Sequence, residues 1–231
     1  MPKTDILSPH YDDAVLSAWH QIEGPNTRVI TVFGGSPENN KTGFWDKNST
    51  QMNGADTIKL RQAENQDALK NTTTSALNLS FLEIQYALFG KRNLIEIMDT
   101  IEEVVTKNAA IIAAAGLGRF LKFHMDHIDT RKVALGLLDR GHDVSFYADI
   151  PYMLPKNDFD HWPEKISVEK AQRILGVPLT IEPYELSSEQ KMRKQLAVQA
   201  FSSQIPSINK SFNNALDNPE TYRWEAIIKP K

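Results

Sequence analysis

The fold of this chain is decided by Ile6-Leu7-Ser8-Pro9-His10-Tyr11-Asp12-Asp13, where an apolar start runs into a polar turn. The pattern predicts a short buried strand over residues 4–7, a tight turn, and a helix over residues 14–22. His10 and Asp13 are close enough in sequence to bind one ion where the turn enters the helix. Asp12 points elsewhere in this arrangement and remains free to act as a base. A structural alternative is that Asp12 or Asp13 caps the helix, where a negative charge is favoured.

A second polar cluster, His124-Met125-Asp126-His127, lies between an apolar run at residues 109–115 and a helical pattern at residues 130–140. The apolar run predicts a buried parallel strand. Ligands of open parallel sheets bind at the carboxyl ends of the strands. Because both clusters follow strand-like runs, we expect them to meet at that edge. Two histidines and one carboxylate with an open fourth position are typical of a catalytic zinc site.

The rest of the chain alternates between strand-like and helical stretches, which predicts a Rossmann-like α/β fold: a mostly parallel sheet with helices on both faces. Further strands are expected at residues 28–33, 79–84, 143–148, 179–183 and 222–228, and further helices at residues 55–69, 94–105, 167–175 and 187–201. Residues 36–50 predict a long surface loop, of a kind that is functional or disordered. Phe44 and Trp45 in that loop either clamp it to the body or face a substrate. Without repeats or a linker, residues 1–231 are expected to form a single domain.

Composition excludes several classes of protein. The 231 residues include no cysteine, which excludes a disulfide scaffold and thiolate metal sites and leaves His, Asp and Glu as ligands. A net charge of −3 without a Lys/Arg cluster argues against nucleic-acid binding. No apolar run approaches the ~20 residues of a membrane span, and no secretory signal is recognised. We therefore expect a soluble, cytoplasmic protein.

The two clusters divide into the roles needed for metal-assisted hydrolysis. His10, Asp13 and one histidine of the second cluster would hold a divalent ion, which polarises a carbonyl and lowers the pKa of bound water toward ~7. Asp12 would accept the proton of the attacking water. The remaining histidine, His124, would donate a proton or a hydrogen bond, and Asp126 would orient a ligand histidine. Such a set fits hydrolysis of an amide, an ester or a phosphoester.

Other polar residues have structural interpretations. Arg61 and Glu64 predict a solvated ion pair on a helix face, worth a few tenths of a kcal/mol. Glu64 and Glu83 are expected to be solvated rather than catalytic. Gly116-Leu117-Gly118 lacks the third glycine of a dinucleotide-binding loop. Nucleophile schemes find no support, because the chain has neither cysteine nor a Gly-x-Ser-x-Gly elbow.

Together, the two clusters resemble the motifs of the PIG-L (LmbE-like) family of metal-dependent de-N-acetylases, usually Ala/Ser-His-Pro-Asp-Asp-Glu and His-Pro-Asp-His. The resemblance implies a Rossmann-like fold and zinc held by His10, Asp13 and His127. It also implies Asp12 as the general base and His124 as the acid or oxyanion stabiliser.

This chain departs from the family pattern at Tyr11 and Met125, where proline is usual, and at Ala14, where glutamate is usual. None of these changes removes a ligand or the base. Weaker matches are Arg61-x-x-Glu64, which resembles a motif whose arginine lies near substrate, and Asp149-Ile150-Pro151-Tyr152, which resembles a strand-end motif of one branch. They imply Arg61 and Tyr152 as substrate-binding residues. The C-terminal third matches loosely and is expected to shape substrate choice.

The resemblance implies a zinc-dependent hydrolase that removes an N-acetyl or other N-acyl group from an amino sugar, such as N-acetylglucosamine, or from a sugar conjugate. Fe2+ is an alternative ion. Two other classes stay open: a metal-dependent esterase or phosphoesterase acting on a small molecule, and a non-catalytic α/β binding protein. The sequence leaves open the oligomeric state, a homo-oligomer included, and whether residues 36–50 close over substrate.

Overall fold

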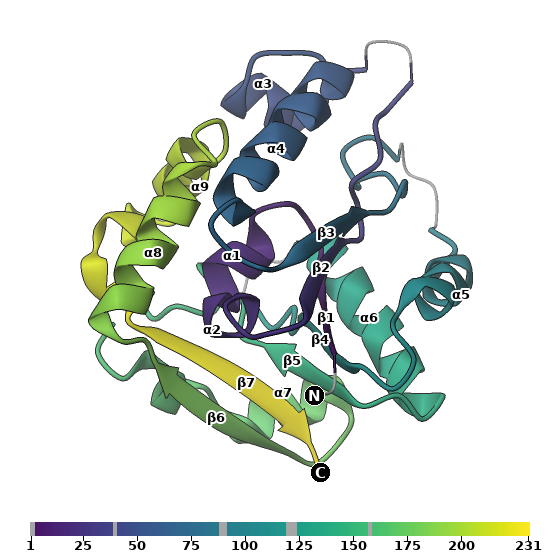
Figure 1. Cartoon of the computed structure of the whole chain (residues 1–231), viewed down its shortest axis with the longest axis vertical. Helices are drawn as coiled ribbons and strands as arrows, with labels where there is room; N and C mark the ends of the chain where they lie inside the picture. The colour runs from purple at the N-terminus through teal and green to yellow at the C-terminus, as the bar shows by residue number, and fades with distance from the viewer. Residues whose placement is uncertain (1–2, 39–40, 88–91, 119–123, 157–158) are drawn as a thin grey trace.

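A seven-stranded sheet forms the centre of the protein, in the strand order β3-β2-β1-β4-β5-β7-β6 (Figure 1). The structure, a computed structural model, describes residues 3–38, 41–87, 92–118, 124–156 and 159–231. The strands are β1 (Thr4–Ser8), β2 (Thr27–Thr31), β3 (Ser75–Asn78), β4 (Ala110–Ala114), β5 (Val144–Tyr147), β6 (Leu179–Glu185) and β7 (Trp224–Pro230). β1 to β5 pair in parallel, whereas β7 is antiparallel to both β5 and β6. The predicted mostly parallel α/β sheet is confirmed.

The order of the strands reverses between β1 and β4. β2 and β3 follow β1 to one side, while β4 and β5 continue on the other side. β1 and β4 pair directly, with Thr4 opposite Ala110 and Leu7 opposite Ala113. Such a reversal is where open α/β sheets bind ligands, just beyond the carboxyl ends of the strands. The segments that follow β1 and β4 therefore start side by side.

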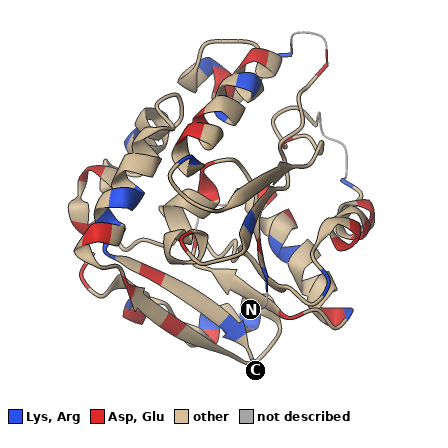
Figure 2. Cartoon of the chain, in the orientation of Figure 1, with Lys and Arg blue, Asp and Glu red and all other residues tan. Residues whose placement is uncertain are grey.

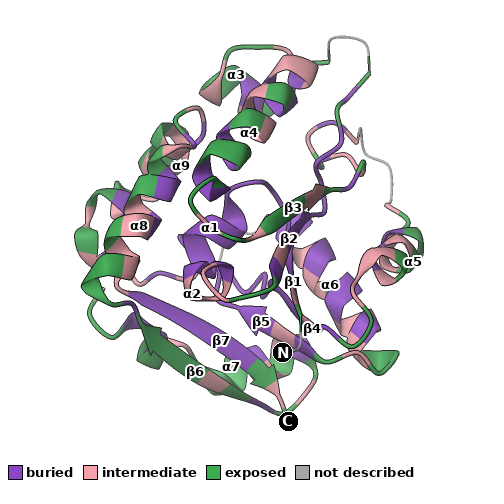
Figure 3. Ribbon diagram, viewed as in Figure 1, coloured by how far each residue is buried: buried purple, intermediate pink, exposed green. Residues whose placement is uncertain are grey.

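Helices cover both faces of the sheet (Figure 1). They are α1 (Asp13–Ser17), α2 (Trp19–Ile22), α3 (Phe44–Ser49), α4 (Gly54–Leu69), α5 (Leu94–Val104), α6 (Met125–Asp139), α7 (Val168–Leu175), α8 (Ser188–Gln199) and α9 (Ile205–Ser211). Successive strand residues point to opposite faces, so Ile6 packs with the core under α1, α2, α4 and α8, and Leu7 with the core under α5, α6 and α7. Figure 3 shows the central strands buried between these layers.

Two of the expected helices bury polar residues. The predicted helix at residues 130–140 begins earlier, at Met125, with His124 at its N-cap. α4 matches the predicted helix at residues 55–69, but its buried face includes Arg61 and Glu64. In both helices, polar side chains at helical spacing line the candidate site, which hides the apolar periodicity.

Three other local predictions are wrong. The strand expected at residues 79–84 is β3, at residues 75–78, and beyond it Ser80 forms only an isolated bridge with Phe33. The predicted helix at residues 14–22 is interrupted at Ala18, between α1 and α2. The loop expected at residues 36–50 contains α3, which the buried carboxylate of Asp46 stabilises by accepting hydrogen bonds from the Gly43 amide (2.8 Å) and the Tyr86 hydroxyl (2.9 Å).

Acidic and basic residues are interspersed along α4 and α8 (Figure 2). Within the described ranges, no helix combines the length and the apolar character needed to cross a membrane.

Candidate metal centre

A compact turn after β1 positions the first cluster. The Ser8 hydroxyl donates to the carbonyl of His10 (2.5 Å) and accepts from the Ala14 amide (3.0 Å), which closes the turn onto α1. The carboxylate of Asp13 accepts a hydrogen bond from the His10 amide (2.8 Å). Asp12 occupies the N-cap of α1, but its side chain makes no capping hydrogen bond within the described chain. The carboxylates therefore do not act as simple helix caps.

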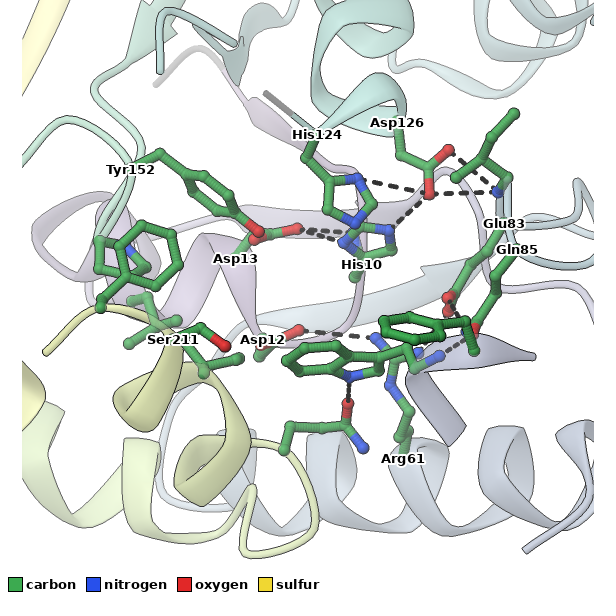
Figure 4. Close-up of a pocket in the computed structure, with 18 residues that line it drawn as sticks. His10, Asp12, Asp13, Arg61, Glu83, Gln85, His124, Asp126, Tyr152 and Ser211 are labelled. Atoms are coloured by element: carbon green, nitrogen blue, oxygen red, sulfur yellow. Dashed lines mark hydrogen bonds and ion pairs between the residues drawn. The ribbon is translucent and has the colours of Figure 1, made fainter. Parts of the chain in front are cut away.

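Asp13 lies between two histidines that come from distant parts of the chain. One of its oxygens is 3.1 Å from Nδ1 of His10, and the other is 3.2 Å from Nε2 of His127 on α6. The three predicted ligands therefore come together at the carboxyl edge of the sheet, next to the reversal in strand order (Figure 4 shows His10 and Asp13).

A carboxylate holds the far nitrogen of each histidine. Nε2 of His10 is 2.9 Å from Asp126, and Nδ1 of His127 is 2.8 Å from Asp149, the second residue after β5. Metal-binding histidines commonly hydrogen-bond a carboxylate through the nitrogen that does not bind the ion, which fixes the tautomer. Asp126 was expected in this kind of role. Asp149 was not, although its position just after a strand could have indicated it.

The backbone at Gly116, just after β4, packs closely against both Asp149 and His127. The Gly116 amide donates to Asp149 at 2.7 Å. Gly116 has a φ of +55°, and a Cβ at this position would lie 2.8 Å from the carbonyl oxygen of His127. Any side chain here would therefore push apart the end of β4 and the start of α6, so this glycine in the Gly-Leu-Gly stretch serves close packing.

The donor set fits a divalent ion. Nε2 of His127 is buried and has no hydrogen-bond partner among the described residues, as expected for an atom whose partner is an ion. Nitrogen atoms of His10, His124 and His127 lie within 4.8 Å of one another. Neutral imidazoles with a carboxylate are typical ligands of zinc and similar ions. His124 could replace Asp13 as a ligand by distance, but no carboxylate of the described residues hydrogen-bonds its ring, and Asp126 is 3.7 Å away.

A second group of donors, within 4.8 Å of one another, consists of His10, Glu83 and Asp126. Both carboxylates in this group are already engaged, because Glu83 pairs with Arg61 and accepts from Gln85 (2.7 Å), and Asp126 accepts from His10. The first group therefore fits an ion better.

Burial and charge separate the pKa values of the other two candidate catalytic residues. Burial, and then the neighbouring charge of Asp13, raise the pKa of Asp12 to about 6. Burial, and then the positive charges of His10 and His127, lower the pKa of His124 to about 3. Asp12 can therefore accept a proton near neutral pH, whereas His124 is a neutral imidazole.

The environments of Arg61, Glu64 and Glu83 correct three expectations. Arg61 is buried, pairs with Glu83, and brings Nη2 to 3.7 Å from Asp12, so it does not form a solvated pair with Glu64. Glu64 is buried and accepts from the amide and hydroxyl of Ser203, both at 2.7 Å. Glu83 is likewise buried rather than solvated. Their partners lie far away in sequence, which the helix pattern cannot reveal.

A cavity of about 250 Å3 opens over this centre (Figure 4). Its floor is formed by polar residues of the centre, and its walls by aromatic and aliphatic side chains. The residues that line it are His10, Asp12, Asp13, Leu16, Phe44, Trp45, Arg61, Glu83, Ile84, Gln85, His124, Asp126, Pro151, Tyr152, Gln204, Ile208, Ser211 and Phe212. Arg61 and Tyr152, the two expected substrate-binding residues, are both among them. The centre of the Tyr152 ring lies 4.6 Å from the centre of the His127 ring and 5.0 Å from the centre of the Phe212 ring.

Trp45 has both of the roles considered for it: it anchors its segment to the rest of the protein, and it lines the cavity. Its indole Nε1 donates to the side chain of Gln204 at 2.7 Å, and its amide donates to Gln85 at 3.0 Å. Its ring lines the cavity, while Phe44 is largely exposed. Gln204 belongs to the segment that leads into α9, an element that the sequence did not predict.

No protein-family model matches the sequence, and neither does any curated protein. Solved structures do match. The zinc-inhibited form of teicoplanin deacetylase Orf2 matches with a TM-score of 0.70 and 20% identity, covering 98% of this chain and 97% of that one. N,N'-diacetylchitobiose deacetylase from Pyrococcus horikoshii matches with a TM-score of 0.56 and 12% identity, covering 99% and 84%.

A third match is GalB, the 4-carboxy-2-hydroxymuconate hydratase from Pseudomonas putida, with a TM-score of 0.56 and 15% identity, covering 99% of this chain and 95% of that one. The protein therefore has, over almost its whole length, the α/β fold that these enzymes share. Two of the three are deacetylases and one is a hydratase, so the fold by itself does not decide the reaction. That decision depends on the residues of the centre.

Proposed function

We propose that this protein is a metal-dependent hydrolase of the PIG-L (LmbE-like) type, which removes an N-acetyl or other N-acyl group from an amino sugar or sugar conjugate. The observation that carries this proposal is the convergence of His10 and His127 on Asp13, with Asp12 beside them at the floor of a cavity. Two structural matches that are themselves deacetylases support it.

His10, Asp13 and His127 would hold the ion, through Nδ1 of His10 and Nε2 of His127. The bound ion, zinc or another divalent ion such as Fe2+, supplies Lewis-acid polarisation of the amide carbonyl and lowers the pKa of water. Asp126 and Asp149 accept hydrogen bonds from the other ring nitrogens, which would leave Nδ1 of His10 and Nε2 of His127 to bind the ion.

The proton moves through Asp12. Its carboxylate accepts a proton from water as the new C–O bond forms, and a pKa of about 6 suits a base that works near neutral pH. As the C–N bond breaks, the same carboxyl returns the proton to the leaving nitrogen. His124 is neutral and donates a hydrogen bond to the oxyanion. Of the two roles expected for His124, acid or oxyanion stabiliser, we therefore assign the second.

The walls of the cavity suit a sugar. Trp45, Tyr152 and Phe212 offer aromatic surface to the C–H face of a sugar ring, while the polar floor meets its substituents. Arg61 lines the cavity, but its bonds to Glu83 and its approach to Asp12 make it a support for the base rather than a free substrate-binding group.

The test is to measure the metal content of the purified protein together with amine and acetate release from N-acetylglucosamine, N,N'-diacetylchitobiose and aryl or alkyl conjugates of N-acetylglucosamine. The protein is stripped and reloaded separately with Zn2+, Fe2+, Co2+ and Mn2+, because zinc inhibits the Orf2 deacetylase. About one ion per chain with amine release is the expected result. One ion without amine release redirects the proposal to esters, phosphoesters or hydration, and no ion under any loading contradicts it and favours a binding protein.

A further inference from the structure

Arg92 contacts Asp126, the carboxylate that is hydrogen-bonded to the proposed ligand His10. The Arg92 side chain is only 9% exposed, and its Nη1 forms an ion pair with Asp126 and a second one, of 3.1 Å, with Asp129. Its Nη2 donates to the carbonyl of Leu82 at 2.8 Å, and its guanidinium carbon lies 4.0 Å from the centre of the Phe33 ring. These contacts hold both Nη atoms and one face of the guanidinium group, while Nε is buried without a hydrogen-bond partner in the described chain.

Asp126 connects Arg92 to the candidate metal centre. Its side chain is completely buried, and its two oxygens have separate partners. One pairs with Arg92, and the other accepts from Nε2 of His10 at 2.9 Å, while the Ile84 amide lies 3.2 Å and 3.3 Å from the two. An ionised carboxylate accepts hydrogen bonds only, so the Nε2 of His10 that faces Asp126 carries a proton. This leaves Nδ1, which faces Asp13, as the ring nitrogen that would bind an ion.

Arg92 holds this buried carboxylate in place. Nη1 pairs with Asp126 and Asp129, and Nη2 donates to the Leu82 carbonyl, so the guanidinium group is itself anchored by other parts of the chain. An anchored guanidinium group fixes the position of the Asp126 oxygen that faces it, and with it the other oxygen, which accepts from His10. The carboxylate behind the other ligand histidine is held differently: within the described chain no arginine or lysine lies at ion-pair distance from Asp149, which accepts from His127 and from the neutral amide of Gly116, while Arg131 interacts with it only at longer range.

We propose that Arg92 is a positioning residue that acts through Asp126 to fix the ring of His10, with Nε2 toward Asp126 and Nδ1 toward Asp13, for metal binding. This inference builds on the metal centre of the proposed function, but it does not depend on which reaction the centre performs.

The first test is the metal affinity of Arg92→Ala and Arg92→Lys, measured by competition with a chelator. Loss of a group that orients a metal ligand usually weakens metal binding about 10- to 100-fold. We expect this loss in Arg92→Ala, partial retention in Arg92→Lys, and partial recovery of Arg92→Ala when guanidinium ion is added. Circular dichroism shows that each variant is folded.

Two matched variants separate positioning from stability. Arg28 pairs with Asp5 at 2.8 Å and donates to the Val104 carbonyl at 2.7 Å, so it has the same kinds of partner as Arg92, but at the amino ends of the strands, away from the metal centre. Arg28→Ala should lower the melting temperature but leave metal affinity unchanged. Asp129→Asn removes the other carboxylate partner of Arg92 and should keep affinity close to that of the unchanged protein.

The second readout observes the hydrogen bond between His10 and Asp126 directly. NMR of the zinc-loaded protein detects the Nε2–H proton of His10 and measures how fast it exchanges with water. We expect slow exchange in the unchanged protein and in Arg28→Ala, and faster exchange in Arg92→Ala. The inference is overturned if Arg92→Ala keeps both the slow exchange and the metal affinity, or if Arg28→Ala weakens metal binding equally. An active deacetylase that gives either result would still satisfy the proposed function, whereas an inactive protein that shows the Arg92 effect would contradict the proposed function alone.

Discussion

Trp45 and Gln204 are joined across the cavity by a hydrogen bond of 2.7 Å from the indole Nε1 to the amide oxygen, although α3 and α9 are far apart in sequence. Gln204 is nearly fully buried, so this oxygen has no water to replace the indole. The bond therefore keeps two separate walls of the cavity at a fixed distance, and the position of both walls depends on it.

Trp45→Phe keeps an aromatic wall but leaves the buried amide of Gln204 without its donor. An unsatisfied buried acceptor costs about 1–3 kcal/mol. We expect the free energy of unfolding to fall by about that amount and KM to rise more than kcat falls, measured by chemical denaturation and steady-state kinetics. Trp224→Phe is the matched control, because the indole nitrogen of Trp224 is buried without a partner in the described chain. An equal loss in both variants would show that the Trp45 hydrogen bond is unimportant.

Asp12→Asn tests the base. Removing a general base typically lowers the rate about 10²- to 10⁴-fold, and none of the proposed ligands is changed, so metal content should stay the same. Asp13→Asn is the comparison, and it should lose tight metal binding. Loss of the ion in Asp12→Asn would contradict the division of roles between these neighbouring carboxylates.

The pH profile gives an independent check on Asp12. Its pKa is raised to about 6, and only the ionised form accepts a proton. The value of kcat/KM should therefore be constant above that pH and fall as the pH decreases through about 6. The acidic limb should be absent from the residual activity of Asp12→Asn; an unchanged limb in that variant would assign it to another group.

Glu83→Gln distinguishes a support from a ligand. Glu83 belongs to the second group of donors, but in the structure it holds Arg61, which lies beside Asp12. If it is a support, the ion should stay bound at the same stoichiometry, while kcat falls by up to about 100-fold because the base is misplaced. Metal content and kcat should be measured on the same preparation of Glu83→Gln. Loss of the ion would show that Glu83 is a ligand instead.

The parts of this site that follow strands could be predicted from the sequence. His10, Asp13 and His127 come together because β1 and β4 are neighbours, and the carboxyl ends of parallel strands meet at one edge. Arg92 and Glu83 could not be found in this way. Both residues act through partners on other helices and loops. In the sequence alone, they cannot be distinguished from charged residues on a solvent-exposed loop.

The helices were also predicted incompletely, because the contacts that bury their polar residues come from distant parts of the chain. α4 and α6 bury charged groups that the site requires, so their apolar periodicity is broken where they approach the centre. α3 depends on tertiary hydrogen bonds to Asp46, and its own sequence looks like a loop. Tertiary contacts override local propensity in each case.

A buried ion pair behind α1 and α2 gives the final prediction. Glu225 on β7 is fully buried, accepts from the amides of Trp19 and His20 at 2.8 Å and 3.0 Å, and pairs with the fully buried Lys194 at 2.6 Å. Although burial alone raises the pKa of Glu225, the Lys194 charge and the hydrogen bond to His20 lower it to about 2. Breaking a buried pair by removing one partner costs about 3–5 kcal/mol, so Glu225→Gln should be destabilised by about that amount at neutral pH.

The sign of the pH dependence follows from the lowered pKa. A carboxyl group whose pKa is lower in the folded state contributes stability above its unfolded pKa, and this contribution is lost as pH falls through the folded pKa. The difference in unfolding free energy between the unchanged protein and Glu225→Gln should therefore be largest above pH 4.5 and shrink toward pH 2. Denaturant titrations at several pH values measure it. The double variant Lys194→Met with Glu225→Gln leaves no unpaired charge and should be more stable than Glu225→Gln alone; a simple addition of the two losses would show that the pair is not coupled.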